Sequence, residues 1–167
     1  MNPFVERAIA RQEAALGASL DYLRTLGETS TAAVVKMGAF APLAEHRKAA
    51  APDVWHLARL AATQVQDCGT CVQIVVNQAL SDGVPRPLLR AALEAGALED
   101  GQRLAMAFGR AVASREGALE AGDAVRDWFG EDVRVELALA VATCQLFPIL
   151  KRGLGQDLAC ALVTVEV

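Results

Sequence analysis

The sequence predicts an all-α fold, and three observations carry that prediction. Hydrophobic residues make up 53% of the 167-residue chain but aromatic residues only 5%, so the apolar content is mostly alanine, leucine and valine, which suit closely packed helices. Apolar residues recur at helical spacing, and glycine and proline divide the pattern into short segments. No stretch carries a strong β-hairpin signal. We therefore expect a single all-helical domain over residues 1–167.

The N-terminal part, residues 1–51, is expected to form helices that precede the main core. Asn2 is a favourable N-cap, and Pro3 follows it at the first helical position. The apolar residues after Pro3 are spaced as in one helix that ends at Gly27. A short helix is then expected over residues 29–37.

The core is expected within residues 52–155, in a series of shorter helices. The expected helices cover residues 52–66, 68–82, 85–95, 98–112, 121–129 and 133–152. The last of these has apolar residues nearly all around it, so we expect it to be central. Its longest apolar stretch, residues 137–150, falls short of the about 20 residues that cross a bilayer, which favours a core helix over a membrane span.

The tail, residues 158–167, fits either a last helix or an extended segment. Its β-branched residues Val163, Thr164 and Val165 are compatible with an extended chain, whereas the residues before them are compatible with a helix.

The charge of the chain argues against nucleic-acid binding. The net charge is −4, the pI is about 5.2, and the arginines and lysines are scattered rather than clustered. Residues 1–11 include Glu6 and lack the apolar segment of a signal peptide, so we expect a cytoplasmic protein with no membrane partner. In a reducing compartment, a C-x-x-C pair is more often catalytic or metal-binding than a structural disulfide.

The main candidate for chemistry is the pair Cys68 and Cys71, in the motif Cys-Gly-Thr-Cys. The motif is expected to open a helix that Asp67 caps. Residues three apart share a helical face, and the first turn of a helix stabilises a thiolate through its N–H groups and dipole. By this argument Cys68, nearer the helix end, is the nucleophile. The pair then serves in a dithiol–disulfide cycle or forms half of a metal site. The alternative is a pair of cysteines that pack between helices and take part in no chemistry.

A metal site lacks support from the spacing of the ligands. A structural zinc site needs four ligands, and the chain adds only His46 and His56 to the one C-x-x-C pair. We therefore expect no metal and no cofactor. Cys144 and Cys160 stand singly in apolar surroundings and are expected to be ordinary buried thiols.

A proton-handling partner for the thiols is also expected, and His56 is the candidate. It forms a stripe with Leu60 and Gln64 on the helix before the motif, so it would face the thiols if the two helices pack antiparallel. Histidine titrates near neutrality, which suits proton transfer. The alternative is a histidine half-buried beside Trp55 with both ring nitrogens satisfied.

The motif and its surroundings resemble a known family. Cys68-Gly69-Thr70-Cys71 is followed by Val72, by Ala79-Leu80 and by Gly83, and later segments continue the likeness. Those later segments are Leu104-Ala105-Met106-Ala107-Phe108, Trp128-Phe129-Gly130-Glu131-Asp132, Val135-Glu136-Leu137-Ala138-Leu139-Ala140 and Lys151-Arg152-Gly153-Leu154-Gly155. Over residues 52–155 the chain is similar to the alkylhydroperoxidase (AhpD-like) and carboxymuconolactone decarboxylase superfamily.

The resemblance implies an all-α fold in which a helical hairpin holds the cysteines. It also implies a homo-oligomer, often a trimer or hexamer, with its sites near subunit interfaces. In the peroxidase branch the second cysteine, here Cys71, attacks the hydroperoxide and the first, here Cys68, resolves it, and a thiol or dithiol donor then reduces the disulfide. This assignment reverses the one from the helix end, and both are carried forward.

The chain departs from the family pattern at two positions. The peroxidases have a histidine four residues after the second cysteine, where this chain has Val75, and a glutamate twelve residues before the first, where it has His56. A thiol peroxidase with His56 as a replacement base is the leading hypothesis. The alternatives are a lactone decarboxylase, against which the intact dithiol argues, and a non-catalytic oligomer that binds a small ligand or partner.

Overall fold

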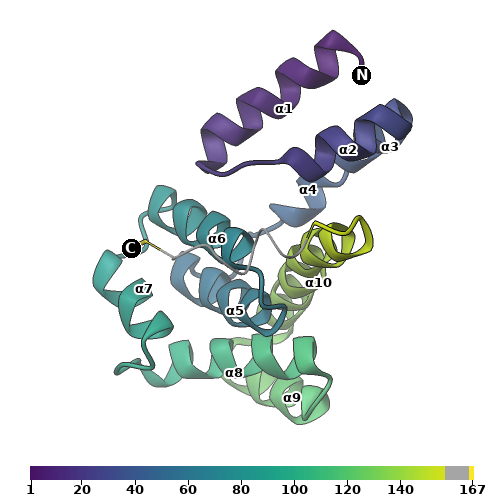
Figure 1. Ribbon diagram of the computed structural model, residues 1–167. Coiled ribbons are helices and arrows are strands. Elements are labelled where there is room, and N and C mark those ends of the chain that lie inside the picture. Colours follow the sequence, from purple (N-terminus) through teal and green to yellow (C-terminus); the bar gives the residue numbers. More distant parts are fainter. Residues whose placement is uncertain (157–165) are drawn as a thin grey trace.

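The computed structural model describes residues 1–156 and 166–167, and over those residues it is helical without any strand, which confirms the all-α prediction (Figure 1). The helices are α1 (Pro3–Leu16), α2 (Asp21–Thr29), α3 (Thr31–Gly38), α4 (Ala41–Ala44), α5 (Pro52–Val65), α6 (Gly69–Ser81), α7 (Arg86–Leu93), α8 (Asp100–Ser114), α9 (Ala118–Phe129) and α10 (Glu131–Gly153). The tail predictions and Cys160 lie outside the described residues.

Helices α1 to α3 lie at one end of the molecule, and α8 and α9 lie at the other (Figure 1). The predicted cap is confirmed, because the Asn2 side chain accepts a hydrogen bond from the Phe4 N–H at 2.9 Å and Pro3 is the first helical residue. The prediction of one helix up to Gly27 is wrong. The first helix ends at Leu16 because Gly17 adopts a left-handed conformation, with φ of 63°, and Gly27 lies inside α2.

Helix α5 lies between the other core helices. All ten residues from Val54 to Thr63 are buried, and the helix packs against α6, α8 and α10. The contact with α8 brings backbone against backbone: a Cβ atom at Gly109 would lie 2.0 Å from the Ala58 carbonyl oxygen. Only glycine permits this approach, so Gly109 fixes the position of α5 on α8.

Helix α10 is the long apolar helix that the sequence predicts, and it contributes Leu137, Ala140 and Val141 to the core. Its length and composition alone would also suit a membrane crossing. In this structure the helix packs against α5, α8 and α9.

A buried carboxylate joins α10 to the segment before α5. Glu136 accepts hydrogen bonds from the backbone N–H groups of Lys48, Ala49 and Ala50, at 2.8 to 3.1 Å. Burial alone would raise the pKa of Glu136, but these backbone donors hold it below its usual value. The chain therefore enters α5 from a segment that is anchored on α10.

Candidate functional site

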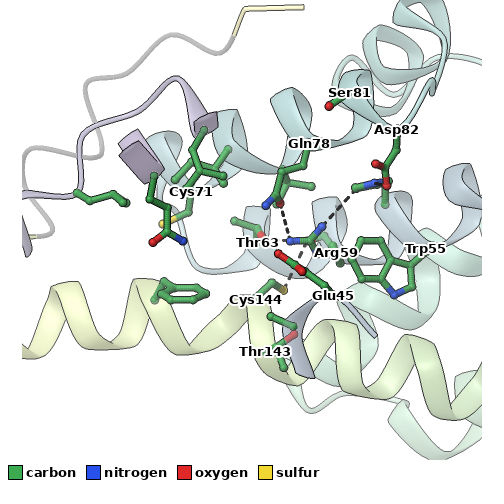
Figure 2. Close-up of a pocket in the computed structure, with 18 of the residues that line it drawn as sticks. Glu45, Trp55, Arg59, Thr63, Cys71, Gln78, Ser81, Asp82, Thr143 and Cys144 are labelled. Atoms are coloured by element: carbon green, nitrogen blue, oxygen red, sulfur yellow. Dashed lines mark hydrogen bonds and ion pairs between the residues drawn. The ribbon is translucent and has the colours of Figure 1, made fainter. Parts of the chain in front are cut away.

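A cavity of about 420 Å³ lies among α1, α2, α5, α6 and α10. Figure 2 shows Cys71 at one end of it and Arg59 with Gln78 towards the other. The wall near Cys71 is mostly apolar, whereas the Arg59 end is polar. Its apolar and sulfur-bearing lining includes Leu16, Leu20, Tyr22, Cys71, Ile74, Val75 and Phe147, and its polar lining includes Glu45, Arg47, His56, Arg59, Gln78 and Asp82.

The C-x-x-C pair lies where α6 begins. Cys68 is the N-cap residue and Cys71 lies in the first turn, so the expectation that Asp67 caps the helix is wrong. Asp67 instead has φ of 50°, a left-handed conformation in the tight turn after α5. Both cysteines are buried and in the reduced form. Among the described residues, the cavity is lined by Cys71 but not by Cys68.

The Cys68 thiol is a weak acid in this environment. The pKa of Cys68 is raised well above its usual value, first by its hydrogen bond with Cys71 and then by burial. The positive charge of Lys151 acts in the opposite direction but does not cancel the effect. Cys68 therefore keeps its proton while Cys71 faces the cavity.

Two further side chains lie at the thiol end of the cavity. Lys151 is buried, and its Nζ lies 5.1 Å from the centre of the Tyr22 ring. Burial, followed by the nearby sulfurs of Cys71 and Cys68, raises the pKa of Tyr22, so its phenol stays protonated at neutral pH. The motif spacing does not predict either residue; the available signals are that Tyr22 is the one tyrosine in the sequence and that Lys151 follows a long apolar run.

His56 lines the same cavity as Cys71, but both of its ring nitrogens are engaged elsewhere. Nε2 lies 2.9 Å from Asp82 Oδ2, and Nδ1 lies 3.4 Å from Arg59 Nη1. An arginine N–H can only donate, so Nδ1 accepts and Nε2 carries the proton that it donates to Asp82. The ring also packs edge-on against Trp55, with centroids 4.8 Å apart. These contacts match the alternative expectation of a histidine beside Trp55 with both ring nitrogens satisfied.

This environment keeps His56 neutral. Burial lowers its pKa to about 4; the hydrogen bond to Asp82 opposes this effect, and the Arg59 charge adds to it. To take a proton from a thiol, His56 would first have to give up its contact with Arg59. Its catalytic role stays a prediction.

Arg59 is the charged residue that the sequence pattern does not single out. It is only 7% exposed, and its Nη2 donates to Gln78 Oε1 at 2.7 Å. Its guanidinium carbon lies 4.3 Å from the centre of the Trp55 ring, and its Nε has no hydrogen-bond partner. Burial lowers the pKa of Arg59. The available signal was a lone charge between Val54 and Thr63 on an otherwise largely apolar helix.

Two further expectations concern Cys144 and a metal site. Cys144 is a buried thiol that donates to the Val141 carbonyl at 3.2 Å, as expected for a packing cysteine, and burial raises its pKa. The described part of the chain contains no group of three or more histidine, cysteine or acidic side chains that could hold a metal ion.

The chain matches no protein-family model, no curated protein and no solved structure. The resemblance to the alkylhydroperoxidase superfamily therefore stays a prediction that the residues of the site must support.

Proposed function

We propose that the chain is an AhpD-like thiol peroxidase, which reduces hydroperoxides through a dithiol–disulfide cycle of Cys68 and Cys71. One observation carries the proposal: two reduced cysteines lie together at the first turn of α6, and one of them lines a cavity large enough for an organic substrate.

The cycle has three steps. The Cys71 thiolate attacks the terminal oxygen of a hydroperoxide; the O–O bond breaks, the sulfur becomes a sulfenic acid, and the alkoxide takes a proton and leaves as an alcohol. The Cys68 sulfur then attacks the Cys71 sulfur, which forms the disulfide and releases water. Two thiols of an external donor finally reduce the disulfide and become a disulfide themselves.

The assignment of Cys71 as the nucleophile is supported by its access to the cavity and by the protonated state of Cys68. Cys71 lines the cavity, whereas the raised pKa of Cys68 makes it a poor first nucleophile. The same hydrogen bond that keeps Cys68 protonated holds it next to Cys71, where a resolving thiol is needed. This order agrees with the resemblance and not with the expectation from the helix end.

Lys151 and Tyr22 are the proposed replacements for the proton relay of the family. A buried ammonium group close to the thiols favours a thiolate, and a phenol that stays protonated can donate to the departing alkoxide. Val75, at the position of the family histidine, is buried, and its aliphatic side chain has no group that can donate or accept a proton. His56 is a less suitable base, because its two nitrogens already bind Asp82 and Arg59.

A homo-oligomer is part of the proposal. Large apolar side chains are exposed on the single chain, among them Phe4, Leu119 and Trp128, at 77%, 74% and 60%. The proposal is that a second copy of the chain covers residues such as these. Sedimentation velocity tests this point; a protein that sediments as a monomer at micromolar concentration contradicts it.

The decisive experiment is a thiol titration in a Cys144→Ser, Cys160→Ser background. One equivalent of hydroperoxide should consume both remaining thiols. Cys68→Ser should stop at a sulfenic acid that dimedone traps, and Cys71→Ser should leave Cys68 unreacted. No loss of thiols at modest peroxide excess overturns the proposal, and a trapped sulfenic acid on Cys68 reverses the assignment.

A non-catalytic ligand-binding oligomer is the second candidate. The observation that favours it is that the polar end of the cavity is built from Arg59, Gln78 and the His56–Asp82 pair, none of which the thiol cycle requires. In that case the cavity binds its ligand and the dithiol stays reduced in the titration above.

A further inference from the structure

The charge of Arg59 has no counter-ion in the described structure. Arginine has five N–H donors, and the side chain uses two of them, toward Gln78 and His56, which are both neutral groups. No carboxylate among the described residues lies within ion-pair distance of Arg59. Arg24, in contrast, pairs with three carboxylates, those of Glu6, Glu13 and Asp21. A buried charge is normally paired, because an unpaired one is costly. An anion bound next to the Arg59 guanidinium would therefore be stabilised.

The acidic residues that line the cavity leave the Arg59 charge unpaired. Among the residues that the structure describes, two carboxylates line the cavity, Glu45 and Asp82, and neither forms an ion pair with Arg59. Asp82 is already taken up by His56 and by Arg47, at 2.9 and 3.3 Å. Neither acidic residue of the described lining therefore neutralises the charge of Arg59.

We propose that the cavity binds an aliphatic carboxylic acid, with the carboxylate against Arg59 and the carbon chain extending toward Cys71. Arginine is well suited to carboxylate because its planar group presents several donors at once. The cavity lining supplies apolar contact for the chain, from Ile74 and Val75 of α6 and Phe147 of α10. A phosphate or sulfate would leave that wall without a partner.

The substrate class follows if the thiol cycle operates. A ligand anchored at Arg59 delivers its far end to Cys71, so the substrate is the hydroperoxide of an aliphatic carboxylic acid. This step rests on the proposed function, whereas carboxylate binding at Arg59 does not.

Glu45 supplies an independent handle on the site. Its carboxylate lines the cavity and contributes a negative charge to the surroundings of Arg59, without forming an ion pair with it (Figure 2). A bound carboxylate would be repelled by Glu45. Removing the Glu45 charge should therefore strengthen binding, whereas removing the Arg59 charge should weaken it.

Binding is tested on the reduced protein with octanoate, methyl octanoate and inorganic phosphate. Trp55 packs against Arg59, so its fluorescence reports occupancy once the exposed Trp128 is replaced by Phe. Octanoate should bind at least tenfold more tightly than its methyl ester. Arg59→Met should remove that difference, whereas Arg110→Met, at an exposed arginine of α8, should keep it.

Several outcomes overturn the site. Equal affinity for acid and ester, a preference that survives Arg59→Met, or phosphate binding as tight as octanoate each does so. If Arg59→Met does not fold, Glu45→Gln decides: several-fold tighter octanoate binding supports the site, and unchanged or weaker binding overturns it.

The substrate class is tested separately with a hydroperoxy fatty acid of medium chain length and its methyl ester. The acid should have the higher kcat/KM, mainly through KM, and the ratio should fall toward one in Arg59→Met. A protein that binds octanoate but loses no thiols to either peroxide fails as a peroxidase while keeping its carboxylate site. A peroxidase that does not discriminate acid from ester keeps the proposed function and loses this inference.

Discussion

Two buried charges in this molecule have different surroundings, and the contrast separates a structural charge from one that awaits a ligand. Glu136 on α10 is 4% exposed, and the backbone N–H groups of residues 48–50 satisfy its carboxylate. Arg59 on α5 is 7% exposed, binds only neutral side chains and borders a cavity. The protein provides every donor that the first charge needs, whereas the second has no counter-ion among the residues that the structure describes.

The largest expected effect is on Glu136. Glu136→Gln replaces the carboxylate by an amide whose NH₂ group would face the backbone N–H groups of residues 48–50. The free energy of unfolding should therefore fall by about 3 kcal/mol at neutral pH. Urea denaturation measures it. Glu131→Gln is the matched control, because Glu131 lies exposed on the same helix and pairs only with Arg134; similar losses in both variants would contradict a structural role for Glu136.

The acid limb of the stability curve belongs to the same prediction. Because the folded-state pKa of Glu136 is lowered, its contribution is present above the unfolded value of about 4.3 and is lost as the pH falls through the folded value. Glu136→Gln should therefore be the less pH-dependent protein in that window.

A smaller effect is expected from His56, the neutral neighbour of Arg59. Its pKa is about 4 in the folded protein, against about 6.5 when unfolded, so the stability that it contributes is present above 6.5 and is lost as the pH falls toward 4. The wild-type protein should lose up to about 2 kcal/mol from this source between pH 7 and pH 5. Thermal or urea unfolding across that range should show a flatter profile in His56→Gln; an identical slope would falsify the interpretation.

The smallest effect on stability is expected from Arg59 itself. Arg59→Met removes a buried charge that has no counter-ion in the described part of the chain and keeps much of the side-chain volume, so the free energy of unfolding should change by less than about 1 kcal/mol. Since the Arg59 charge also lowers the pKa of His56, the loss of stability between pH 7 and pH 5 should shrink in this variant. A loss as large as that of Glu136→Gln would mean that Arg59 is structural.

The sequence carried enough information for the helical class, for most boundaries within residues 52–155 and for the dithiol. These depend on local patterns: apolar spacing, helix stops and a motif of four residues. The prediction of a single helix up to Gly27 failed because the apolar residues keep their helical spacing across the break after Leu16. Gly17 ends α1 in a left-handed conformation, but in the sequence it is one glycine among several and nothing marks it as a helix end. Asp67 failed as a cap because a tight turn comes between the two helices.

The partners of the two buried charges could not be predicted from local sequence patterns. Glu136 binds backbone groups 86 to 88 residues away, and Arg59 reaches Gln78 on the next helix. A lone charge inside an apolar helix signals that a partner exists, but only the packing of helices shows whether the protein itself provides one.

The glycine contact between α5 and α8 has a consequence for how this site can diversify. Because Gly109 clamps the Ala58 backbone, α5 cannot shift without a steric clash on its far side, and His56, Arg59 and Thr63 keep their positions. The opposite walls come from α6 and α10, where side chains such as Ile74 and Phe147 can change size without meeting that constraint. Natural variation or directed evolution of ligand length should therefore accumulate on those two helices, while the charge that anchors the ligand is inherited unchanged.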